Sequence, residues 1–134
     1  MTYYGAKHLA NSFRTVRKNT LAIAEEIPEE QYGFKPTPDV MSVGEMLAHV
    51  AVAPMWQIDV HGQKMEQLDV AFFGMRMQQG KAEEQVLRTK AEIIGALTAN
   101  GERFAQFLEG LDEATLQGSV ALPAASGAAH KTRF

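Results

Sequence analysis

Apolar residues recur every three or four positions in the first part of the chain, which is the spacing of an amphipathic helix. The repeat runs from about Gly5 to Ile27, and charged residues such as Arg17 fall between the apolar positions. It stops at Pro28, because proline disfavours helical geometry in the preceding residue and lacks a backbone N–H. We therefore predict a first helix over residues 5–27. Its predicted buried face consists of Leu9, Phe13, Val16, Leu21, Ile23, Ala24 and Ile27.

A short proline-rich segment follows this helix. Pro36 and Pro38 both push the residue before them out of helical geometry, so the segment from Gly33 to Pro38 is predicted to be extended. We expect it to act as a strap across one end of the domain. Tyr32 and Phe34 are its predicted anchors.

A second helix is predicted from Ser42, because Ser42 and Glu45 have the spacing of a capping box. Pro54 lies well inside the helical pattern and should kink the helix near Val50 or split it into two, and the pattern favours a kink. Gly62 is a suitable C-terminal stop. The predicted buried stripe is Val43, Met46, Leu47, Val50 and Ala53, flanked by His49 and Trp56.

The segment over residues 62–80 has no sustained helical stripe and is predicted to be a long crossover. Its apolar residues are too many for a free loop, so they should pack across the bundle or against a second subunit. These residues are Phe72, Phe73, Met75 and Met77, and Met65 adds to a methionine-rich set that could form an adaptable contact surface.

A third helix is predicted from about Ala82 to Leu111, where three/four spacing returns. Gly95 and Gly101 each cost this helix about 1 kcal/mol relative to alanine unless they permit a close helix approach. From Gln117 onward the chain is predicted to be irregular, with an extended piece over residues 120–122.

Composition limits the class of protein. A chain of 134 residues fits one domain, over residues 1–134, and 46% hydrophobic residues without a long apolar run exclude a membrane span. The charged N-terminus lacks a secretory signal and predicts a cytoplasmic protein. With no cysteine, any metal must be held by His, Asp or Glu, and a net charge of -3 argues against nucleic acid or anionic membrane as a partner.

His49 is the candidate for chemistry, although a lone histidine beside an apolar stripe is more often a hydrogen-bonded core residue. His61 lies twelve residues further on, about 18 Å along a helix, so it cannot share an ion with His49 and is predicted to be a cation at a helix C-terminus. His8 and His130 are predicted surface residues. Glu45 could orient a metal-binding His49 or act as a base, but its capping role already explains it. Trp56 could form the wall of a substrate pocket, but a large aromatic at this spacing is usually a core residue, so core packing is the prediction.

The chain resembles the DinB/YfiT-like family through the run IPEEQYGFKPTPDVMSVGEMLAHVA, residues 27–51, and the long first helix. The resemblance implies an all-α four-helix bundle with a long crossover between helices two and three. It also implies homodimers and a divalent metal, such as Ni, Zn, Fe or Mn, held by three histidines. One of these matches His49, and two would lie in an HxxxH motif on the last helix. The sequence contains no HxxxH, so we expect residues 131–134 to be the first turn of a last helix that is missing or truncated.

Two functions follow as hypotheses. The resemblance implies a metal-dependent hydrolase or thiol-transferase acting on a small molecule, with His49 as one ligand and the others beyond Phe134. The alternative is a non-catalytic helical bundle whose open groove binds a partner helix or another copy of the chain.

Overall fold

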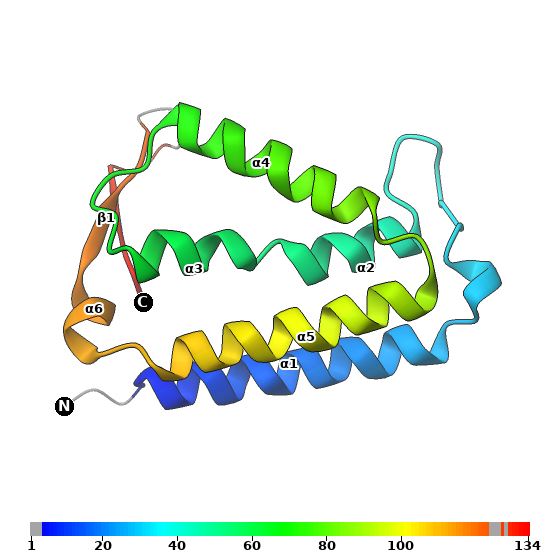
Figure 1. Ribbon diagram of the computed structural model, residues 1–134, viewed down its shortest axis with the longest axis horizontal. Helices are drawn as coiled ribbons and strands as arrows, with labels where there is room; N and C mark the ends of the chain where they lie inside the picture. The colour runs from blue at the N-terminus through cyan, green and yellow to red at the C-terminus, as the bar shows by residue number, and fades with distance from the viewer. Residues whose placement is uncertain (1–3, 124–126, 128) are drawn as a thin grey trace.

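The computed structural model describes residues 4–123, 127 and 129–134. The chain forms α1 (Ala6–Glu26), a 3₁₀ turn η1 (Glu29–Gln31), α2 (Val43–Val52), α3 (Met55–Gly62), α4 (Val70–Gln85), α5 (Lys90–Glu109), α6 (Glu113–Gln117), β1 (Ser119–Ala121) and β2 (His130–Thr132). In Figure 1, α1 and α5 run side by side, α2 and α3 follow one another along the next row, and α4 forms the outer row. The all-α bundle predicted from the sequence is confirmed.

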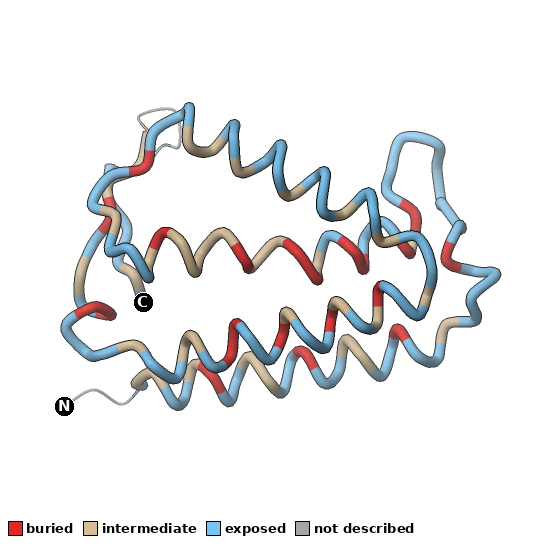
Figure 2. Tube along the Cα trace, viewed as in Figure 1, coloured by how far each residue is buried: buried red, intermediate tan, exposed pale blue. Residues whose placement is uncertain are grey.

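The core lies among α1, α2 and α5, as the buried positions in Figure 2 show. One buried cluster joins these helices to the strap and comprises Ala24, Tyr32, Leu47, Ala48, Ala51, Ile93 and Leu97. A smaller cluster at the other end comprises Val60, Leu68 and Val120. No described helix is long and apolar enough to cross a membrane.

The first helix ends where predicted, but its buried face is narrower than expected. Val16 and Ile23 are 61% and 57% exposed, whereas Arg17, assigned to the polar face, is buried. The reason is that α1 packs mainly against α5, so only one strip of its surface is covered. Small residues at Ala10 and Ala24 let the two helices approach closely.

The helix break at Pro54 occurs where the sequence predicts it, and it produces two helices, α2 and α3, rather than one kinked helix. Pro54 has no N–H to donate to the Val50 carbonyl. The Arg17 guanidinium donates to that carbonyl instead, at 3.1 Å, and the Asn100 side-chain amide donates to the Ala51 carbonyl, also at 3.1 Å. Burial lowers the pKa of Arg17. Side chains from α1 and α5 therefore satisfy the backbone groups that the break exposes.

Gly101 explains how Arg17 reaches the break. A Cβ at Gly101 would lie 2.8 Å from Cγ of Arg17, so only glycine leaves room for this side chain. Close approach, which the sequence left open as a reason for Gly95 and Gly101, therefore applies at Gly101. Around Gly95, by contrast, no described atom lies within 4 Å of such a Cβ.

The strap is anchored by Tyr32 but not by Phe34. The Tyr32 hydroxyl donates to the Ala24 carbonyl at 2.6 Å, while Phe34 is 56% exposed. The capping box is present as predicted: the Glu45 amide donates to Ser42 Oγ at 3.1 Å, and the Ser42 amide donates to the Glu45 carboxylate at 2.6 Å. Met46, which follows the box, is 49% exposed and was wrongly placed in the buried stripe.

The crossover contains a helix that the sequence reading missed. α4 starts where the Asp69 side chain accepts from the Phe72 amide at 2.7 Å. The structure describes all residues of α4, and none of them is buried. Because the helix has no buried face, its sequence shows no regular apolar spacing that would predict a helix. The third predicted helix starts at Lys90 rather than Ala82, after a capping box formed by Thr89 and Glu92. α4 therefore covers part of the groove that was expected to stay open.

The last described residues form a strand, not the predicted helical turn. β2 pairs antiparallel with β1, with Ser119 opposite Thr132 and Ala121 opposite His130. The Arg133 amide donates to the Gly118 carbonyl at 2.8 Å, and its guanidinium donates to the Met65 carbonyl. These contacts hold the segment extended, and the predicted extended piece over residues 120–122 is confirmed by β1.

Candidate functional site

His49 projects from α2 toward α4, where it meets Glu84. Its Nδ1 lies 2.8 Å from Oε1 of Glu84, and the two side chains are 46% and 19% exposed. An ionised carboxylate can only accept a hydrogen bond, so the proton of a neutral His49 ring belongs on Nδ1. The Nε2 lone pair is then available to a ligand. His49 is therefore a hydrogen-bonded surface histidine rather than a core residue.

An apolar pocket of about 470 Å³ opens beside this pair, between α2–α3 and α4. Trp56 and Phe73 form an edge-to-face pair in its wall, with ring centres 5.8 Å apart. Trp56 is half-buried and also packs against the cluster around Val60, so it serves both the core, as predicted, and the pocket wall. The other apolar lining residues are Met41, Val52, Ala53, Met55 and Met77.

Arg76 fixes α4 over this pocket. Its guanidinium forms an ion pair with Asp59 of α3 at 2.9 Å and donates to the Gln79 side chain at 2.8 Å. The ion pair joins α4 to α3 and so holds this wall of the pocket in place. Asp59 also offsets the charge of Arg76. The charges left to interact with a ligand must come from other residues.

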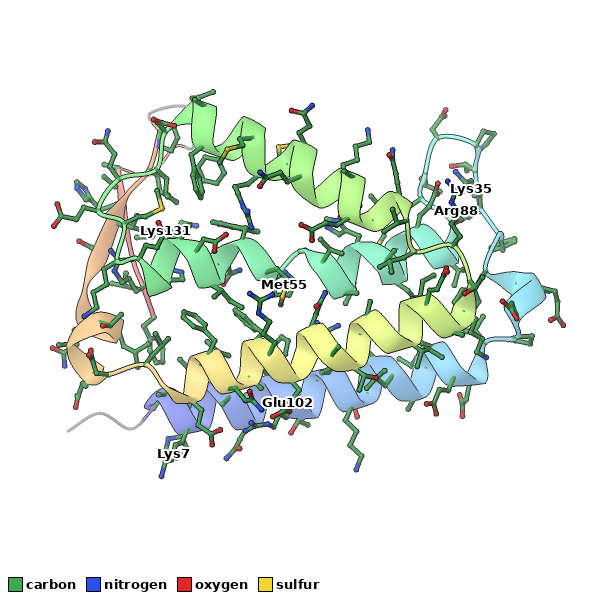
Figure 3. All side chains as sticks on the ribbon, in the orientation of Figure 1. Lys7, Lys35, Met55, Arg88, Glu102 and Lys131 are labelled. Carbon is green, nitrogen blue, oxygen red and sulfur yellow. The ribbon has the colours of Figure 1, made fainter. Side chains whose placement is uncertain are left out.

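A second, more polar pocket of about 720 Å³ lies under the strap, between it and the turn from α4 to α5. Met41, Lys81 and Glu84 line both pockets, so the two adjoin at the His49–Glu84 pair. Figure 3 shows Lys35 of the strap and Arg88 of the turn near one another at this end of the molecule. We call the two pockets together the cleft.

Glu45 is committed to structure, as its capping role predicted. It caps α2 and forms an ion pair with Lys35 at 3.0 Å. The hydrogen bond from the Ser42 backbone, followed by Lys35, lowers the pKa of Glu45. The carboxylate that pairs with His49 is Glu84, which lies 35 residues away on an element the sequence reading did not identify. No local motif could have revealed it.

The remaining histidines lie apart from the site. His8 and His130 are exposed, as predicted. His61 lies in the last turn of α3, as predicted, but burial, and then the charge of Arg133, lowers its pKa and so disfavours the predicted cation. Its Nδ1 lies 3.3 Å from the Arg133 guanidinium and so accepts a hydrogen bond. His61 helps to hold β2 rather than a ligand.

The described residues can be compared with the donor set that a metal ion needs. Within residues 4–123, 127 and 129–134, no group of three or more His, Asp or Glu side chains could hold a metal ion. The His49–Glu84 pair nevertheless has the form seen at many metal sites, where a carboxylate accepts from one ring nitrogen and the other nitrogen binds the metal. The pair therefore fits one arm of a metal centre.

Comparison with known proteins gives one match. The family model described as the DinB superfamily matches residues 12–132, which include the strap, the cleft and both strands. No curated protein and no solved structure matches the chain significantly.

Proposed function

Because this chain belongs to the DinB superfamily, we propose that it is a metal-dependent enzyme acting on a small molecule, with His49 as one ligand of a divalent metal. The observation that carries the proposal is the hydrogen bond between His49 Nδ1 and Glu84. This bond fixes the ring orientation and increases the basicity of Nε2. Its position at the mouth of an apolar pocket suits an enzyme site.

The proposed reaction class is hydrolysis or thiol transfer. A divalent metal, such as Ni, Zn, Fe or Mn, would act as a Lewis acid in either reaction. The residues of this chain have simpler roles. Glu84 orients His49 and holds its proton on Nδ1, Arg76 keeps α4 over the pocket, and Trp56 and Phe73 exclude water from one wall. The described residues do not by themselves contain a group of three metal donors.

Metal binding tests the proposal. We expect metal analysis of the protein at its natural full length, after dialysis against Zn²⁺ or Ni²⁺, to show bound metal in the unmodified form and background amounts in His49→Ala. Glu84→Gln should weaken metal affinity about 10- to 100-fold, because it removes the charged partner of the ring. The surface variant His130→Ala is the matched control and should retain metal. Equal metal content in the unmodified protein and His49→Ala would disprove the assignment.

Self-association is the second candidate function, and it is favoured by the exposed apolar residues around α4. Val70, Met77 and Val86 are 70%, 74% and 67% exposed. Light scattering tests this: a monomer at all concentrations up to about 100 times the working concentration would rule it out, while a dimer weakened by Met77→Asp would support it.

A further inference from the structure

We infer that the apolar pocket beside His49 binds a small uncharged molecule whose surface is mostly apolar. The inference deepens the proposed function, since it names the ligand class of the same site and rests on that proposal for any chemistry. Binding itself needs no metal, so it can be measured separately. Three features of the pocket point to this ligand: its apolar wall, the balance of its charges and the glycine of α4 that leaves it open.

The wall of the pocket offers a ligand apolar surface from both sides. On the α2–α3 side, Val52 and Met55 are buried and Trp56 is half-buried. On the α4 side, Phe73 is half-buried and Met77 is 74% exposed. The volume of about 470 Å³ lies within the usual range for small-molecule sites, and covering apolar surface stabilises a complex by about 25 cal/mol per Å². A ligand with an apolar surface is therefore favoured here.

Gly80 leaves the pocket open from the α4 side. A Cβ at this residue would lie 3.9 Å from Cγ1 of Val52, so Gly80 faces a side chain that lines the same pocket. A side chain longer than that of alanine would extend into the space between them. Gly74, on the same helix, has no described atom within 4 Å of such a Cβ and lines neither pocket. The two glycines of α4 therefore differ in whether they face the pocket.

The charges that line this pocket are balanced. Its cations are Arg76 and Lys81, and its carboxylates are Glu83 and Glu84. Arg76 is already paired with Asp59, which does not line the pocket. Lys81 and Glu84 are three residues apart on α4, so their opposite charges lie on the same face of the helix, and Glu83 is exposed to water. None of the four needs a counter-charge from a ligand.

The adjoining polar pocket does not change this balance. It adds three cations and three carboxylates, namely Lys35, Arg88, Lys90, Glu29, Asp39 and Glu45. Lys35 pairs with Glu45 at 3.0 Å, and the Lys90 ammonium donates to two carbonyls at the end of α1, each at 2.7 Å. A charged ligand would leave water without gaining a counter-charge in either pocket, which costs free energy. An uncharged ligand avoids this cost.

Trp56 provides the readout, because it is the only tryptophan among the 134 residues and lines the pocket. We would titrate the protein at neutral pH with 1-decanol, decanoate and decylammonium below their aggregation concentrations, with EDTA present. The three probes share one apolar chain and differ in the charge of the end group. We expect a saturable change in Trp56 fluorescence, with decanol binding about three- to tenfold more tightly than either ion. An ion that binds as tightly as decanol, or the absence of a saturable signal, would overturn the inference.

The two glycines of α4 show whether the probe enters this pocket. Gly80→Leu places a side chain in the pocket and should weaken decanol binding by about tenfold or more, because the side chain takes the space of the ligand. Gly74→Leu is the matched control: it makes the same change on the same helix, away from both pockets, and should bind decanol as the unmodified protein does. Equal decanol affinities in the two variants would contradict the inference.

A second pair of variants covers the case in which circular dichroism shows that Gly80→Leu does not fold. Met77 is 74% exposed, so Met77→Gln should keep the fold, and it should weaken decanol binding about threefold because it makes the pocket wall more polar. Met75→Gln is its control, since Met75 is 48% exposed and lines neither pocket. The same decanol affinity in both methionine variants would count against the pocket.

The two proposals fail separately. Equal metal content in the unmodified protein and His49→Ala, with decanol binding intact in EDTA, would remove the metal-dependent enzyme and leave the binding site. Loss of metal in His49→Ala, with no preference for decanol over the two ions, would remove the ligand class and leave the metal site.

Discussion

The α1–α5 pair and the α4 layer show two ways of packing helices in one small domain. Between α1 and α5 lie fully buried small and aliphatic residues, including Ala10, Leu97 and Ala105. α4 has none; it contacts α2 and α3 through two polar pairs and one aromatic pair, and its half-buried Phe72 and Phe73 pack against the small cluster around Val60. The first arrangement excludes water and stabilises the fold. The second buries less apolar surface and leaves the cleft open to a ligand.

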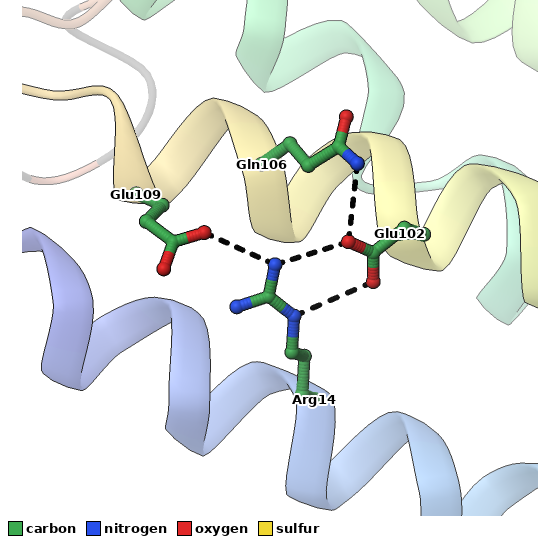
Figure 4. A network of polar contacts seen from close by, with 4 residues as sticks. All are labelled: Arg14, Glu102, Gln106 and Glu109. Atoms are coloured by element: carbon green, nitrogen blue, oxygen red, sulfur yellow. Dashed lines mark hydrogen bonds and ion pairs between the residues drawn. The ribbon is translucent and has the colours of Figure 1, made fainter.

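Surface charges reinforce the contrast. Arg14 of α1 donates to Glu102 at 3.0 Å and to Glu109 at 3.1 Å, both on α5, and Gln106 also donates to Glu102 (Figure 4). These hydrogen bonds raise the pKa of Arg14 and lower that of Glu102. Such exposed ion pairs add little stability individually but fix the alignment of the two helices.

Substitutions that remove side-chain volume should show the largest difference in stability between the α1–α5 pair and the α4 layer. Leu97 is fully buried, so Leu97→Ala should lower the free energy of unfolding by about 2–5 kcal/mol. Met77→Ala on α4 should change it by no more than about 0.5 kcal/mol, since that side chain is largely exposed. Urea denaturation followed by circular dichroism measures both. Similar losses in the two variants would mean that α4 contributes to the core as α5 does.

Two glycines of α5 should respond to alanine with opposite signs. Gly101→Ala forces a Cβ against Arg17 and should destabilise the protein by about 1–3 kcal/mol. Gly95→Ala meets no described atom and should stabilise it by up to about 1 kcal/mol, because alanine favours helix. Thermal denaturation of both variants tests this prediction. A stabilised Gly101→Ala would show that Arg17 does not need the space.

A fall in pH should destabilise the protein through carboxylates on the α1–α5 side, by less than the substitutions above. The folded-state pKa of Glu102 is lowered below its ordinary value of 4.5 by Arg14, and that of Glu92 by the backbone amides of Thr89 and Arg88. The stabilisation from each carboxylate is complete above that ordinary value and is lost as pH falls through the lowered pKa. The urea midpoint should therefore drop between about pH 5 and pH 3.

Glu102→Gln should make this drop shallower. Glu30→Gln, at an exposed residue without an ion pair among the described residues, should not change it. Identical pH profiles for the unmodified protein and Glu102→Gln would contradict the assignment.

The sequence predicted what depends on local signals. The end of α1 at Pro28, the Ser42–Glu45 cap and the break at Pro54 all follow from residues within a few positions of one another. The position of His49 on α2 followed from the same signals. These features are set by backbone chemistry that neighbouring residues control.

Features that depend on distant contacts escaped prediction. α4 was missed because none of its residues is buried and the segment has no sustained apolar stripe. Glu84 was predicted to lie at the start of the third helix, so its contact with His49 from α4 was not foreseen. Arg17 was predicted to face solvent because arginine is usually exposed. In the structure it is buried, because its guanidinium donates to the Val50 carbonyl that Pro54 leaves without a partner, and because Gly101 leaves space for its side chain. Each depends on which helices become neighbours, and no pattern within a single helix records that.

The joint at Pro54 divides the wall of the cleft into two parts, with His49 on one helix and Trp56 on the next. Arg17 and Asn100, which line neither pocket of the cleft, donate hydrogen bonds to the backbone carbonyls at this joint. Substitutions at these two positions would therefore disturb the joint between the histidine and the tryptophan without altering a residue that lines the cleft. Relatives with identical clefts could in this way acquire different ligand preferences through changes on the opposite side of the bundle.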